Sequence, residues 1–178
     1  MKKTKNTLQS LFIMGLALFS TNVYADINAL SPEVRTKEYS LSEGALALGG
    51  YDPVAYFEGG PAKGSSEITE TYKGVVYHFA SVDNHEKFKE NPTKYEPQYG
   101  GWCAWAMADG QRTKANPKSY KLVDGKLYVF YDRFFIDTRE KWNDYIAEYV
   151  DASGNINEAE GESHLIGQAD TYWSNQVL

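Results

Sequence analysis

The sequence contains only one cysteine, Cys103, among its 178 residues. A single thiol excludes an intramolecular disulfide and any metal site built on a CxxC pair. The thiol is therefore buried and inert, bound to a ligand, or paired with another molecule. Burial is the default expectation, because free cysteine is among the most buried residue types.

Basic residues are also scarce: 18 lysines and arginines stand against 24 acidic residues, for a formal net charge of −6. Contact with nucleic acid phosphates requires clustered Lys or Arg side chains. An acidic chain is equally unsuited to anionic membrane surfaces. We therefore expect no nucleic-acid partner.

Long apolar runs are missing as well. The longest, residues 11–19, is too short to span a bilayer comfortably. Three lysines precede it, and small residues suited to signal peptidase follow at residues 23–25. This order predicts a signal peptide over residues 1–25 and export, into the periplasm. Loss of those three lysines would change the net charge from −6 to −9, and after cleavage we expect no membrane partner.

The remaining length suits one domain with one core. A polar N-terminal arm spans residues 26–44, and Pro32 within it argues against a helix. Two β-hairpins are predicted by β-rich runs around short turns. The first pairs residues 68–72 with 75–79, and the second pairs residues 119–123 with 126–131.

Three helices are predicted from capping residues and periodicity. Ser81 is a good N-cap for residues 82–90, and Asp137 with Glu140 forms a capping-box-like start for another helix. A last helix is expected over residues 157–174. The fold class is therefore α+β, with a small antiparallel sheet built from hairpins, a short inserted helix and two C-terminal helices. We find no internal repeat.

Several motifs occur in an order that is specific as a set. They are GGYDPVAYF at 49–57, YHFAS at 77–81, NPTKY at 91–95, PQYGGWCAWA at 97–106 and the hairpin around Asp124–Gly125. In these motifs the chain resembles the YHS domain family, in its exported branch. The resemblance implies a YHS-like domain over residues 45–131 and a C-terminal helical extension over residues 132–178, packed on the same domain. It also implies a metal-binding role.

Some members of that family carry paired cysteines near the helix that follows the YHS strand, where this chain has Asn84 and His85. The strong candidate metal ligands are therefore Cys103, His78 and His85. One thiolate with imidazoles would suit copper, or less cleanly zinc. The alternative is that His78 lies on a strand face, satisfied by the backbone, while Cys103 belongs to the core.

Two further hypotheses concern the same region. Cys103 could act as the nucleophile or redox centre of a thiol-dependent enzyme if His78 faces it as a base. Alternatively, the chain is a binding module for a small ligand or protein partner. Its aromatic groove would then be lined by Trp102, Trp105, Tyr51 and Tyr99. We assign no catalytic residue and favour a non-enzymatic binding protein.

Overall fold

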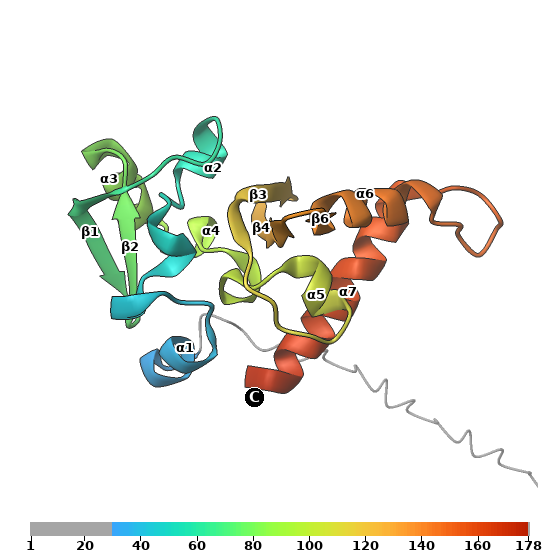
Figure 1. Cartoon of the computed structure of the whole chain (residues 1–178), viewed down its shortest axis with the longest axis horizontal. Coiled ribbons are helices and arrows are strands. Elements are labelled where there is room, and N and C mark those ends of the chain that lie inside the picture. Colours follow the sequence, from blue (N-terminus) through green and yellow to red (C-terminus); the bar gives the residue numbers. More distant parts are fainter. Residues whose placement is uncertain (1–29, 178) are drawn as a thin grey trace, which may run out of the picture.

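The computed structural model describes residues 30–177 and confirms the α+β class. Within these residues the strands form three separate two-stranded antiparallel sheets instead of one (Figure 1). The predicted signal peptide lies outside the described residues. The strands are β1 (Ser65–Tyr72), β2 (Val75–Phe79), β3 (Asn116–Val123), β4 (Lys126–Phe130), β5 (Asp132–Arg133) and β6 (Ile136–Asp137).

Helices lie beside both of the larger hairpins (Figure 1). The α-helices are α1 (Pro32–Glu38), α2 (Ala55–Glu58), α3 (Val82–Glu90), α4 (Pro92–Tyr95), α5 (Ala104–Ala108), α6 (Thr138–Glu148) and α7 (Glu158–Val177). Short 3₁₀ turns are η2 (Glu43–Ala45), η3 (Ala47–Gly50) and η4 (Gln98–Gly101). The predicted caps are present: Ser81 Oγ accepts from Asn84 N–H at 3.1 Å, and Asp137 Oδ1 accepts from Arg139 N–H at 2.8 Å.

Both predicted hairpins form around turns with left-handed backbone. Lys73 and Gly74 have φ of 46° and 83°, and Asp124 and Gly125 have 49° and 72°. Positive φ at both central residues characterises the type I′ turn, whose twist matches that of the flanking strands. The turn residues thus determine where each hairpin reverses.

The two hairpins belong to a tandem repeat, so the expectation of no internal repeat was wrong. The register of the first breaks between Ser65 and Thr69, and that of the second breaks between Asn116 and Tyr120, 51 positions later. Isolated backbone bridges recur at the same spacing: Leu46–Val76 with Pro97–Leu127, and Tyr51–Lys63 with Trp102–Lys114. We define repeat 1 as residues 46–81 and repeat 2 as residues 97–132.

Few side chains carry this repeat, which is why inspection of the sequence missed it. The matched identical residues are Gly49 and Gly100, Gly50 and Gly101, Ala55 and Ala106, Gly59 and Gly110, Lys63 and Lys114, Gly74 and Gly125, Tyr77 and Tyr128, and Phe79 and Phe130. The backbone is matched more closely than the sequence. Leu48 and Tyr99, at equivalent positions before the paired glycines, have φ of 51° and 54°.

Repeat 2 differs at its end. In repeat 1 the chain passes from β2 through Ala80 and Ser81 directly into α3. In repeat 2 a small hairpin, β5–β6, stands between β4 and α6. Its turn residues Phe134 and Phe135 are 94% and 103% exposed.

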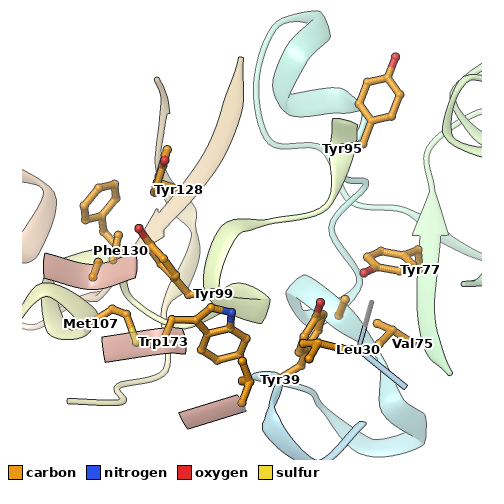
Figure 2. Packing of buried hydrophobic residues seen from close by; sticks show 14 of the residues in the cluster. Leu30, Tyr39, Val75, Tyr77, Tyr95, Tyr99, Met107, Tyr128, Phe130 and Trp173 are labelled. Atoms are coloured by element: carbon orange, nitrogen blue, oxygen red, sulfur yellow. The ribbon is translucent and has the colours of Figure 1, made fainter. Parts of the chain in front are cut away.

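A single large aromatic cluster extends across both repeats (Figure 2). Tyr77 and Val75 of repeat 1 and Tyr128 of repeat 2 belong to it. Trp173 of α7 lies between them, 6.0 Å from the ring of Tyr39 and 6.4 Å from the ring of Tyr99. Burial of such aromatic area is the main favourable contribution to folding.

The N-terminal arm is more ordered than the sequence suggests. Pro32 stands at the start of α1, where its missing N–H is not needed, and Ser31 caps the helix. The expectation that Pro32 opposes a helix was therefore wrong. A Cβ added at Gly100 would lie 2.5 Å from the ring of Tyr39, so the glycine makes room for the arm.

Candidate functional site

Cys103 is a completely buried helix cap. It precedes α5, and its Sγ accepts a hydrogen bond from Ala106 N–H at 3.5 Å. The Oγ1 of Thr138, at the start of α6, lies 3.3 Å from the same sulfur. Cys103 therefore connects α5 to the helix that follows the second hairpin.

The hydrogen bonds around Thr138 identify the thiol as a donor. The Thr138 hydroxyl donates its only proton to Tyr131 O, at 2.8 Å. In the contact with Cys103, the proton must therefore come from the sulfur. Both polar contacts of the sulfur are thus made within the fold, one to α5 and one to the start of α6.

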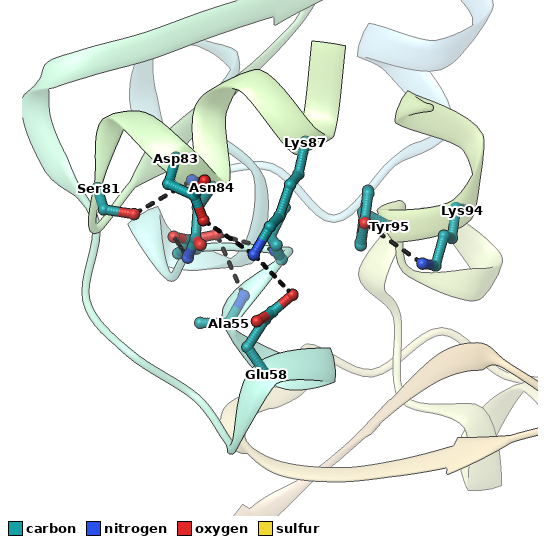
Figure 3. A network of polar contacts seen from close by, with 10 residues as sticks. Ala55, Glu58, Ser81, Asp83, Asn84, Lys87, Lys94 and Tyr95 are labelled. Carbon is teal, nitrogen blue, oxygen red and sulfur yellow. Dashed lines mark hydrogen bonds and ion pairs between the residues drawn. The ribbon is translucent and has the colours of Figure 1, made fainter. Parts of the chain in front are cut away.

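Asp52 is the counterpart of Cys103 in repeat 1, and its carboxylate connects α2 to α3 in a similar way. Its Oδ1 accepts from Val54 N–H at 2.8 Å, and its Oδ2 accepts from Ala80 N–H at 2.8 Å and Asn84 Nδ2 at 2.7 Å. Figure 3 shows Asn84 of α3 above Ala55 of α2, and beside them Lys87, which pairs with Glu58 of α2 and Asp83 of α3. Cys103 and Asp52 thus occupy equivalent positions, and each connects a short helix to the next longer helix of the chain.

The structure does not bring the candidate metal ligands together. His85 lies 2.9 Å from Glu70 Oε2 and against the ring of Phe79. His78 lies on β2, and a Cβ added at Gly50 would be 3.3 Å from its Nδ1. Among residues 30–177, no group of three His, Cys, Asp or Glu side chains could hold a metal ion.

The four aromatic residues proposed for a groove are dispersed. Tyr99 is buried and donates to Asp170 Oδ1 at 2.9 Å, while Trp102 donates to Glu38 O at 2.7 Å. The ring of Tyr51 lies 4.6 Å from Lys63 Nζ. Trp105 lines a small cavity of about 120 Å³, beside Tyr145.

A different cavity lies where the two repeats and the N-terminal arm meet, and we call it the junction pocket. Its volume is about 230 Å³. The buried part of its lining, which we call the floor, consists of Leu48 of repeat 1 and of Gly101 and Val129 of repeat 2. Ser40 and Ser42 of the arm form one wall.

The two repeats differ in two contacts at the positions that line this pocket in repeat 2. In repeat 1, Lys63 Nζ donates to Gly49 O at 2.6 Å, and His78 packs beside Gly50. In repeat 2, Val129 stands where repeat 1 has His78. The carbonyl of Gly100, counterpart of Gly49, accepts instead from the backbone N–H of Ser40, at 2.9 Å.

The exposed residues of the lining, which we call the rim, carry the charge of the pocket. Lys114 and Arg133, both exposed, line it, and none of the described residues that line it is acidic. Sequence reasoning missed both cations, because they lie 19 positions apart and in no recognised motif. The repeat is the one signal that could have indicated Lys114, because Lys114 is the counterpart of Lys63 in repeat 1.

No helix in the described part of the chain is long and apolar enough to cross a membrane. Comparisons with family models, with curated proteins and with solved structures found no match. The resemblance to YHS domains therefore stays a prediction.

Proposed function

We propose that this protein is an exported, non-enzymatic binding protein that holds a small molecule in the junction pocket. The observation that carries the proposal is the pocket itself, enclosed by three segments distant in sequence. Ligand pockets commonly measure about 300–1,000 Å³. A cavity of about 230 Å³ suits a ligand at or below the small end of that range.

The arrangement at Cys103 supports binding over thiol catalysis. The sulfur is 0% exposed, and its polar partners within residues 30–177 are Thr138 and the backbone of Ala106. A nucleophile needs access to substrate and a base that forms the thiolate. We therefore expect Cys103→Ser to leave ligand binding unchanged.

Binding of copper or zinc, implied by the resemblance to YHS domains, remains the second hypothesis. It can be tested separately by elemental analysis of protein purified without chelators. About one equivalent of metal, reduced in His78→Ala and Cys103→Ser, would support it. Metal content unchanged in both variants would exclude this ligand set.

The pocket can be tested by thermal shift with a panel of amino acids, sugars, carboxylic acids and phosphates. Ala115, which lines the pocket and is half-buried, can be changed to phenylalanine to fill it. We expect at least one compound class to raise the melting temperature of the natural protein and to lose this effect in Ala115→Phe.

Gly167→Ala is the matched control, because a Cβ there meets no atom within 4 Å and lies in α7, away from the pocket. It should respond to the ligand as the natural protein does. If no compound class acts, or if Ala115→Phe responds normally, the proposed function is wrong.

A further inference from the structure

We infer that the ligand of the junction pocket is a small anion with a carboxylate or phosphate group, bound by Lys114 and Arg133. This inference rests on the proposed function and specifies its ligand class. It arises from the comparison of the two repeats, which shows one lysine engaged and its counterpart released.

Lys63 in repeat 1 is committed to intramolecular contacts. Its ammonium donates to Gly49 O at 2.6 Å and lies over the ring of Tyr51. Lys114 has the same backbone setting, bridged to Trp102 as Lys63 is to Tyr51.

In repeat 2 the equivalent carbonyl, Gly100 O, has the arm as its donor instead of Lys114. The arm supplies Ser40, whose N–H donates to Gly100 O at 2.9 Å. Lys114 makes no ion pair or side-chain hydrogen bond with any other residue in the described range. The same arm that forms the wall of the pocket thereby releases the ammonium on its rim.

Arg133 comes from the part of repeat 2 that repeat 1 lacks. It pairs with Ile136 in the β5–β6 hairpin, whose base is fixed by Asn116 Nδ2 donating to Asp132 O at 3.3 Å. Its guanidinium likewise has no ion-pair partner among residues 30–177. The inserted hairpin therefore adds a second cation to the same rim.

Two unpaired cations on one small cavity are unexpected in a chain with net charge −6. A guanidinium and an ammonium are the side chains suited to carboxylate and phosphate, through charge-assisted hydrogen bonds. The hydroxyls of Ser40 and Ser42 add polar groups to the wall. Together these groups fit a compact anion better than a neutral sugar or an apolar molecule.

The test is isothermal titration with citrate and with inorganic phosphate, alongside glycerol as a small neutral compound. We expect at least one anion to bind, and its affinity to fall as sodium chloride is raised. Lys114→Gln and Arg133→Gln should each weaken binding about tenfold, the effect of losing one hydrogen bond to a charged group. Lys118→Gln, an exposed lysine on β3 outside the pocket, is the control and should change affinity less than twofold.

The outcomes separate this inference from the proposed function. If neutral compounds bind and Ala115→Phe abolishes their binding while anions do not bind, the pocket is functional and the anion assignment is wrong. Anion binding that is equally strong in Lys114→Gln and Arg133→Gln also refutes it. If nothing binds at the pocket, both proposals fail.

Discussion

The buried ion pair of Arg35 and Glu96 should anchor the N-terminal arm. Arg35 of α1 is 0% exposed and is paired with Glu96, which also accepts from the Tyr77 hydroxyl at 2.5 Å. The guanidinium carbon lies 4.9 Å from the ring centre of Tyr39 and 5.2 Å from that of Tyr72. The change to make is Arg35→Met, which keeps length and apolar contact but removes the charge.

The expected loss is large, because the glutamate stays buried without its cation. Breaking a buried pair from one side costs about 3–5 kcal/mol. Against a total stability of about 5–15 kcal/mol, this is a substantial fraction. In Arg35→Met with Glu96→Gln the buried group is neutral, so we expect at least about 1 kcal/mol to be recovered relative to the single variant.

Urea denaturation followed by tryptophan fluorescence measures these changes in the free energy of unfolding. Lys37→Met on the same helix is the control, since its side chain is 83% exposed, and it should cost less than about 0.5 kcal/mol. A cost below about 1 kcal/mol for Arg35→Met, or no recovery in the double variant, would refute the anchoring role.

Three further changes test individual positions, each by chemical denaturation. Gly100→Ala should cost about 2–4 kcal/mol, because φ is +57° and the new Cβ would meet Tyr39 at 2.5 Å. Gly44→Ala is the control for the cost of the left-handed backbone alone, because its φ is +72° and the new Cβ would meet no atom within 4 Å. Equal costs in the two variants would contradict the steric argument. Phe134→Asn should stabilise the protein by up to about 1 kcal/mol, because φ is +58°, which asparagine tolerates better, and the phenylalanine ring is 94% exposed. A clear loss of stability would show that the ring makes a stabilising contact. Burial raises the pKa of Asp170 above 3.8, so the folded protein binds more protons than the unfolded chain between the two values, and stability falls as pH rises through that window. Asp170→Asn should accordingly gain stability relative to the natural protein as pH rises from 3.5 to 7, and a constant difference would refute this.

The candidate site was only partly accessible from the sequence. The sequence left Cys103 open as a metal ligand, a nucleophile or a core residue; in the structure its buried thiol caps a helix and contacts Thr138 and Ala106 N–H, not His78 or His85. Nothing in the spacing of those residues encodes the distance between them. The junction pocket was not foreseen, because its wall at Ser40 and its floor at Val129 come from segments about ninety positions apart.

By itself, the sequence determined the local structure of this protein. The turns at Lys73–Gly74 and Asp124–Gly125 and the caps Ser81 and Asp137 depend on neighbouring residues, so short patterns predict them. The tertiary structure decided which groups remain free. Lys63 donates to Gly49 O, whereas Lys114 lines a pocket and the equivalent Gly100 O accepts from Ser40 N–H. That last contact joins distant segments, so it is made only when the arm packs on the folded repeats.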